Sequence, residues 1–200
     1  TITEIYDYLR VLYARIGQPH CPLCGTKIEK LSHEEIVNFI KAKIKTLDQG
    51  RLRILAPVVR GRKGEYYQLL YDLLDKGYSE VFVDGKKYKL RERIILTKTK
   101  KHDIDVLVDE ISLADFIIAK GNPSKASQGL PLAKAVAVAK FDSANERLVE
   151  AVERALKEGE GLVKIQLEGD KVEQETFLLS SKFACPNDGF SFPEIEPRLF

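Results

Sequence analysis

All three cysteines of this chain lie in two short clusters, one near each end of the sequence. Cys21 and Cys24 belong to the segment Cys-Pro-Leu-Cys-Gly, and Cys185 begins Cys-Pro-Asn-Asp-Gly, where Asp188 takes the place of a second cysteine. A Cys-x-x-Cys-Gly turn brings two thiolates to one side, where they can share a tetrahedral zinc ion, and a carboxylate is also a zinc ligand. The two clusters therefore predict a closed structural zinc site made by Cys21, Cys24, Cys185 and Asp188.

Other interpretations of the cysteines remain open at this point. His20 or His33 can replace the fourth ligand. Without metal, Cys185 would be a buried thiol, or Cys21 and Cys24 would be a redox pair of the thioredoxin kind. A thioredoxin motif begins a helix after a strand, whereas this motif follows a predicted helix and loop. We therefore expect a metal site, and it would tie together the ends of the 160 residues between Cys24 and Cys185.

Motifs that carry catalysis are missing from the sequence. There is no Gly-x-x-x-x-Gly-Lys-[Ser/Thr] loop for ATP, no Gly-x-Ser-x-Gly elbow and no His-Glu-x-x-His motif. The three histidines are scattered, and His102, within Lys-Lys-His-Asp, is predicted to be a surface residue rather than a base. The chain is therefore predicted to bind a partner and not to be an enzyme.

Positive charge is concentrated in one part of a chain whose net charge is only +2. Residues 86–101 contain eight Lys or Arg residues and one acid, Glu92. Clustered cations release counterions from phosphates, so this stretch predicts a secondary DNA contact. Lysines also keep edge strands soluble, and this explanation fits equally well. The candidate DNA-binding residues are Arg91, Arg93, Lys98, Lys100 and Lys101.

Helical spacing and capping residues predict the first elements. Apolar residues from Ile5 to Ile16 recur at helical spacing and predict a helix that ends near Gly17. Ser32-x-x-Glu35 is a capping box, and it predicts a second helix that stops by Gly50. A strand over residues 51–60, a flexible glycine loop over 61–64 and a helix over 65–76 are expected to follow.

The rest of the chain mixes strands with one more helix. Asp84-Gly85 favours a type I′ hairpin, and strands are predicted near residues 104–108, 162–167 and 172–179. Helix-breaking residues predict that 114–141 is a surface excursion, and the capping box at Ser143 predicts a helix from there to Lys157. The expected fold class is mixed α/β (α+β), with a mainly antiparallel sheet and packed helices on a zinc-tied neck.

Composition is that of a cytoplasmic globular protein. Hydrophobic residues make up 44% and charged residues 31% of the 200 residues. No apolar run reaches the length of a membrane span, and the first residues do not resemble a signal peptide. The start at Thr1 and the absence of methionine suggest a piece of a longer protein.

Several segments together resemble the UvrA family of damage-recognition ATPases in bacterial nucleotide excision repair. The segments are residues 3–10, Cys21-Pro22, residues 55–59 with Lys63-Gly64, residues 101–109 and residues 194–200. The resemblance implies an internal part of an ABC-type ATPase. Residues 1–29 would be the tail of the ATP-binding lobe with half of the zinc neck, 30–180 the inserted UvrB-binding domain, and 181–200 the second half of the neck and the return to the signature domain.

The resemblance also implies ligands and partners. The family has Cys-Pro-x-[Cys/His] before the inserted domain and Cys-Pro-x-Cys-Gly after it, so Cys21, Cys24, Cys185 and Asp188 match zinc positions, with Asp188 departing from cysteine. Zn²⁺ would be structural, while ATP would bind only parts of the parent absent here. The implied partners are UvrB, DNA through the parent, and a second parent copy in a homodimer, with no membrane.

Two family positions bear on partner choice. Relatives tend to have basic residues where this chain has Glu80 and Glu110, and those residues appear to face acidic groups of UvrB. Both carboxylates are therefore predicted to meet basic groups on the cognate UvrB, because facing like charges would weaken the complex. The rival functions are a zinc-ribbon nucleic-acid-binding module, which would need more aromatic residues than Tyr88 in the basic stretch, and a thiol oxidoreductase.

Overall fold

The computed structural model describes residues 2–45, 47, 49–117, 131–169, 172–183, 185 and 197–199. Five α-helices and six strands are assigned in these ranges, with a short 3-10 helix near the C-terminus. In chain order they are α1 (Ile2–Ile16), α2 (His33–Ile44), β1 (Gly50–Lys63), α3 (Tyr67–Asp75), β2 (Glu80–Val83), β3 (Lys86–Lys89), β4 (Lys101–Ser112), α4 (Ala114–Ile117), α5 (Pro131–Glu158), β5 (Leu162–Gly169), β6 (Val172–Ser180) and η3 (Pro197–Leu199).

The strands form one antiparallel sheet in the order β3-β2-β4-β1-β5-β6. This confirms the predicted mixed class. Strand β1 is longer than predicted, because Arg62 pairs with His102 and Lys63 with Lys101. The expected glycine loop at 61–64 is therefore partly strand, since ladder bonds to β4 outweigh the local preference of glycine for turns.

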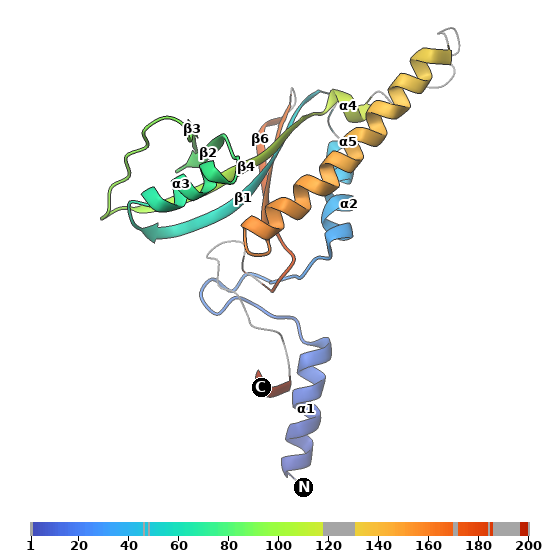
Figure 1. The fold of residues 1–200 in the computed structure, drawn as a ribbon. Coiled ribbons are helices and arrows are strands. Elements are labelled where there is room, and N and C mark those ends of the chain that lie inside the picture. The colour runs from blue at the N-terminus through green and yellow to red at the C-terminus, as the bar shows by residue number, and fades with distance from the viewer. Residues whose placement is uncertain are drawn as a thin grey trace.

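The core lies between one face of the sheet and the helices α2 and α5, which Figure 1 shows side by side against the strands. Leu52 and Ile54 of β1 and Ile104 and Val106 of β4 are fully buried there. They meet a helical stripe that includes Leu148. This apolar layer fixes which side chains of each strand point inward, because side chains alternate along a strand.

Two local signals are confirmed. Ser32 caps α2 in a reciprocal capping box, in which its hydroxyl accepts the Glu35 N–H and the Glu35 carboxylate accepts the Ser32 N–H. Asp84 and Gly85 have φ of 51° and 81°, as a type I′ turn requires. Interactions between residues close in sequence decide both features: hydrogen bonds in the cap, and φ preferences in the turn.

The start of α5 differs from the prediction. The helix begins at Pro131 and continues through Ser143, so the predicted start at Ser143 is wrong. Proline suits the first turn of a helix, and the following Ala, Val and Lys residues extend the helix without a break. Residues 131–141 of the predicted surface excursion are therefore helical, and 118–130 lie outside the described residues.

Helix α1 lies apart from the sheet, on the far side of the neck, with η3 beside it (Figure 1). Much of its apolar surface is exposed, including Ile5, Tyr8 and Ile16. Over the residues that are described, none of the helices has the length and apolarity that crossing a membrane requires.

Candidate metal centre and docking surface

The first cysteine cluster forms a tight turn. The Cys21 N–H donates to the Thr26 carbonyl at 2.8 Å, and the Gly25 N–H donates to the Cys21 carbonyl at 2.8 Å. The Leu23 N–H points at the Cys21 sulfur at 3.4 Å. Gly25 has a φ of +71°, which favours glycine. Both sulfurs are thus presented on one side, as the Cys-x-x-Cys-Gly spacing predicts.

Cys185 joins this turn from the other end of the chain. The sulfurs of Cys21, Cys24 and Cys185 all lie within 4.8 Å of one another, and those of Cys24 and Cys185 are 3.4 Å apart. Zinc–sulfur bonds of about 2.3 Å in a tetrahedron put the sulfurs about 3.8 Å apart. The three side chains therefore fit one soft, tetrahedral metal ion, and the predicted meeting of the two clusters is confirmed for these three residues.

The fourth ligand is not settled by the described residues. Asp188 lies outside them. Neither His20 nor His33 belongs to the group of close ligand atoms. His20 is exposed, with Nδ1 3.0 Å from the Gln18 carbonyl oxygen, and His33 begins α2. The two histidines are therefore not supported as substitutes.

The redox alternative fits the structure less well. Cys21, Pro22, Leu23 and Cys24 form a turn and do not begin a helix, so the helix N-terminus that lowers a thioredoxin thiol pKa is missing here. Cys21 and Cys185 are buried together with Ile28, and only Cys24 is exposed. This arrangement favours a structural site.

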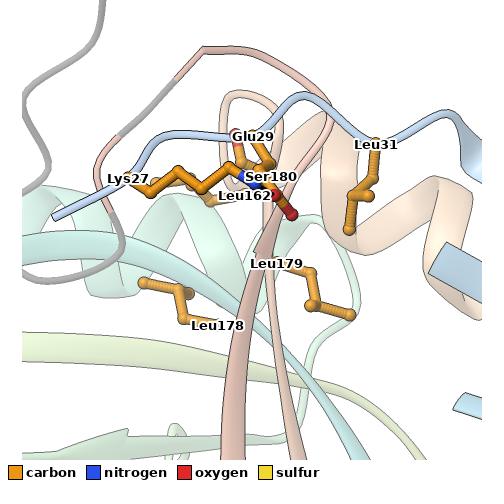
Figure 2. Close-up of a pocket in the computed structure, with 7 residues that line it drawn as sticks. All are labelled: Lys27, Glu29, Leu31, Leu162, Leu178, Leu179 and Ser180. Atoms are coloured by element: carbon orange, nitrogen blue, oxygen red, sulfur yellow. Dashed lines mark ion pairs between the residues drawn. The ribbon is translucent and has the colours of Figure 1, made fainter. Parts of the chain in front are cut away.

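The neck is attached to the base of the sheet by hydrogen bonds. Arg60 of β1 donates to the Cys185 carbonyl at 3.3 Å, and the Leu31 N–H donates to the Ser180 carbonyl at 2.9 Å. A pocket of about 280 Å³ lies between residues 27–31, the start of β5 and the end of β6, and Figure 2 shows the side chains that line it. Lys27 and Glu29, which form an ion pair, line it together with four leucines and Ser180.

The sheet face that points away from α2 and α5 is called here the open face. The strand registers assign its side chains, because residues paired across strands point to the same side. Leu55, opposite Leu107 and Lys164, is fully buried on this face. On strands β1 to β5 the open face consists of Arg51, Arg53, Leu55, Pro57, Glu80, Phe82, Lys87, Lys89, Asp105, Leu107, Glu110, Ser112, Lys164, Gln166 and Glu168.

Five ion pairs between strands cross the open face. Arg53, which is 17% exposed, donates to Glu110 at 2.8 Å and to Glu168 at 2.7 Å. Arg51 also donates to Glu110, at 3.1 Å. The remaining pairs are Lys87 with Glu80 at 2.8 Å and Lys164 with Asp105 at 2.6 Å. Acids and bases thus alternate on a nearly neutral surface.

The pKa values of this face follow from burial and these pairs. Burial raises the pKa of Glu110, but Arg53, with help from Lys87 and Arg51, outweighs burial and holds it below its ordinary value. Burial also raises the pKa of Asp105, and Lys164 offsets only part of that increase. Lys87 forms an ion pair with Glu80, and its charge also lowers the pKa of Glu110. The candidate partner residues Glu80 and Glu110 therefore lie in one region of the open face.

Comparison with known proteins supports the resemblance. A family model described as the UvrA interaction domain matches residues 32–136, more than half of the chain. The chain belongs to the UvrA interaction domain family. The chain is similar over its whole length to proteins called UvrABC system protein A. It is 40% identical to that of Deinococcus radiodurans, 42% to that of Thermus thermophilus and 43% to that of Bradyrhizobium diazoefficiens.

The chain spans less than a fifth of these relatives, from 17% of the Deinococcus protein to 19% of the Bradyrhizobium protein. The match of the UvrA interaction domain model covers α2, β1 to β4 and the start of α5. It therefore covers most of the open face, with Glu80 and Glu110.

Sequence reasoning missed most residues of the open face. Arg53, Asp105 and Lys164 form its central ion pairs, but they lie on three different strands. The only signal was the alternation of charged and apolar residues in Arg51-Leu52-Arg53-Ile54. Such alternation predicts which side chains of the strand point outward, but not which residues of other strands they pair with.

The predicted surface position of His102 is wrong. His102 is only 5% exposed. Its Nδ1 lies 2.8 Å from the Asp84 carboxylate and its Nε2 lies 3.0 Å from the Thr97 carbonyl oxygen. The hydrogen bonds to Asp84 and to Thr97 raise the pKa of His102, and burial opposes them only in part. This side chain joins the β2–β3 turn to the loop before β4.

Proposed function

We propose that this chain is the UvrB-docking part of a UvrA-like protein that acts in nucleotide excision repair in the bacterial cytoplasm. The observation that carries the proposal is the match of the interaction-domain model to the residues that build most of the open face. In this proposal the chain does no chemistry itself. ATP hydrolysis by an ABC-type ATPase, damaged-DNA contact and homodimer formation belong to the longer protein.

The open face is the docking surface in this proposal. Leu107 is half-buried near the centre of this face, beside the buried Leu55 and Phe82, and charged side chains surround these residues. Arg53 is held by two carboxylates, so its side chain would lose little rotamer entropy when a partner binds, and arginine is a frequent anchor of interfaces. These features suit a polar, specific protein contact.

Glu80 and Glu110 set partner choice in this proposal. Their side chains are 24% and 27% exposed, so part of each side chain is accessible to a partner. Basic groups of the cognate UvrB are expected there. Because each carboxylate already has a cation on this chain, the contribution to affinity is smaller than that of an unpaired acid.

A structural zinc ion is the second part of the proposal. Cys21, Cys24 and Cys185 would hold it as thiolates, and Asp188 is proposed as the fourth ligand. The ion would fix the two chain segments of the neck relative to each other. The hydrogen bond from Arg60 to the Cys185 carbonyl would fix them relative to the sheet. Its role is architectural.

Docking is tested with an exchanged ion pair. Reversing the charge of Glu110 alone would put a third cation beside Arg51 and Arg53. The variant would then be less stable, and a loss of binding could not be separated from a loss of folded protein. The double variant Glu80→Lys with Lys87→Glu keeps an ion pair and inverts its direction. We expect at least tenfold weaker binding of the cognate UvrB in calorimetry, because the lysine placed at position 80 would face a basic group of UvrB.

The matched control exchanges Lys76 and Glu158, which form a 2.7 Å pair between α3 and the end of α5, away from the open face. Lys76→Glu with Glu158→Lys should bind UvrB as the wild type does. Equal affinity of both double variants would contradict the assignment of the open face. Failure of the wild-type chain to bind UvrB at all would contradict the proposed function.

Zinc is tested by metal analysis and thiol labelling. We expect one zinc per chain, and slow labelling of all three cysteines that becomes fast with a chelator. Cys185→Ser should lose most of the metal, and Asp188→Ala should bind zinc more weakly while Asp188→Cys binds it more tightly. Rapid labelling of the untreated protein would rule out the metal site, and equal affinity of the two Asp188 variants would remove Asp188 as a ligand.

A further inference from the structure

Strand β4 carries one extra residue relative to its neighbour β1. Leu107 of β4 pairs with Leu55 of β1. The residue before Leu55, Ile54, pairs with Asp109, so Val108 has no partner of its own on β1. Strand β1 pairs with β5 without a shift over the same residues. The irregularity therefore belongs to β4, and it is a β-bulge at Val108 and Asp109.

The bulge reverses the alternation of side chains along β4. Val106 is fully buried on the core side, so an unbroken alternation would turn Glu110 toward the core as well. Instead Ile111 is buried in the main core, and Glu110 lies on the open face opposite Arg53. Burial of Ile111 fixes the face on which Glu110 lies, and the bulge accommodates the extra residue just before it.

Asp109 and Arg147 of α5 hold the backbone of this bulge. The Asp109 carboxylate accepts the Glu110 N–H at 2.8 Å. Arg147 donates to the same carboxylate through Nε at 2.6 Å and also through Nη2. Its Nη2 donates in addition to the Glu110 carbonyl at 3.3 Å. Arg147 thus contacts the backbone of Glu110 from the helix side of the sheet, while the Glu110 side chain lies on the opposite face.

This contact is a specific charged link between the helix layer and the sheet. Among the ion pairs of the described residues, it is the only one that joins α5 to a strand. The hydrogen bond to Asp109 is the main cause of the raised pKa of Arg147, and the charge of Asp115 in α4 adds to it. A guanidinium can bind a carboxylate through two parallel hydrogen bonds, a geometry that a lysine cannot reproduce.

We propose that Arg147 is a positioning residue for partner docking: by holding the bulge at Asp109, it sets the direction in which Glu110 projects from the open face. The inference rests on the proposed function, in which this face binds UvrB. Bulges often re-aim a side chain beside a functional site. The Glu110 carboxylate needs a fixed direction, because it accepts from Arg53 at 2.8 Å and from Arg51 at 3.1 Å. Arg147 itself does not touch the partner.

The test compares the wild-type chain with Arg147→Gln and Arg147→Lys. The pKa of Glu110 is measured by carboxyl NMR in the free chain, and UvrB affinity is measured by calorimetry. Arg147→Gln removes the ion pair, so we expect the Glu110 contact with Arg53 to loosen and the lowered pKa of Glu110 to rise. UvrB binding should weaken about fivefold. Arg147→Lys keeps the charge and should recover part of both effects.

A double-mutant cycle separates positioning from a general loss of stability. In a chain that carries Glu110→Gln, adding Arg147→Gln should change UvrB affinity less than about twofold, because the side chain that Arg147 positions is already altered. The matched control is Arg154→Gln, the same change at an exposed position of α5. It should keep the wild-type affinity and the wild-type pKa of Glu110.

Two results would overturn the proposal. One is an unchanged pKa of Glu110 in Arg147→Gln, and the other is an equal loss of affinity with and without Glu110→Gln. Failure of the wild-type chain to bind UvrB is a different result, because it contradicts the proposed function. The pKa of Glu110 is read in the free chain, so it would still decide whether Arg147 holds Glu110 in position.

Discussion

Arg53 is the central cation of the open face, and its replacement by methionine tests whether the ion pairs across strands stabilise the sheet. Methionine keeps most of the apolar stem and removes the contacts to Glu110 at 2.8 Å and Glu168 at 2.7 Å. Exposed ion pairs contribute about 0.2–1 kcal/mol each. Because Arg53 is only 17% exposed, we expect a loss near the upper end for each pair, about 1–2 kcal/mol in total at low salt.

The pH dependence of this loss has a defined sign. Arg53 is the main reason that the pKa of Glu110 lies below its ordinary value of 4.5, since burial acts in the other direction. A carboxyl group with a lowered pKa contributes stability above its unfolded pKa and loses it as the pH falls through the folded value. The difference between wild type and variant should therefore be full at pH 7 and decline below pH 4.5.

Urea denaturation followed by far-UV circular dichroism measures both effects. The series is run at pH 7 and pH 3.5, each at 50 mM and 500 mM NaCl, because salt screens exposed pairs. Arg154→Met is the control, since Arg154 is exposed on α5 and forms none of the ion pairs of the described residues. A loss under about 0.3 kcal/mol at pH 7, or a loss that neither acid nor salt reduces, would refute the reasoning.

Three further predictions concern stability. Ser32→Ala removes the reciprocal cap of α2 and should lower the free energy of unfolding by about 1 kcal/mol in urea, while Ser32→Asp should retain most of it. Leu148→Ala removes a fully buried side chain of α5 and should cost about 3–5 kcal/mol, whereas Val149→Ala, at a position 38% exposed, should cost far less; similar losses would argue against the packing of α5. The pKa of His102, measured by NMR titration, should lie above the ordinary value near 6.5, and Asp84→Asn should lower it. Because this pKa is raised on folding, its contribution to stability is complete below about pH 6.5 and is lost as the pH rises through the folded value; a normal pKa in the wild type would contradict the two hydrogen bonds.

Features that depend on neighbouring residues could be predicted from the sequence. The Ser32 capping box and the Asp84-Gly85 turn are made by hydrogen bonds and φ preferences within four residues. The Cys21-x-x-Cys24 turn is equally local. Each pattern carries its own physical cause, and each is found where it was expected.

The misplaced boundaries depend on tertiary contacts. Strand β1 extends to Lys63 because β4 supplies a ladder partner there. Helix α5 passes through Ser143 because Phe141, just before it, packs against the main core in line with Ala144 and Leu148. At both places a local stop signal is weaker than the packing or pairing gained by continuing.

The sequence by itself determined the residue types of the candidate metal site, the fold class and the family resemblance, because these depend on composition, spacing and short-range patterns. Only the tertiary structure brought Cys185 to within 3.4 Å of Cys24, 161 positions away. It also aligned Arg53 with Glu110 and Glu168, and paired Arg62 and Lys63 with His102 and Lys101. Strand register decides these neighbours, and register is set by burial of one whole face of the sheet rather than by any single residue.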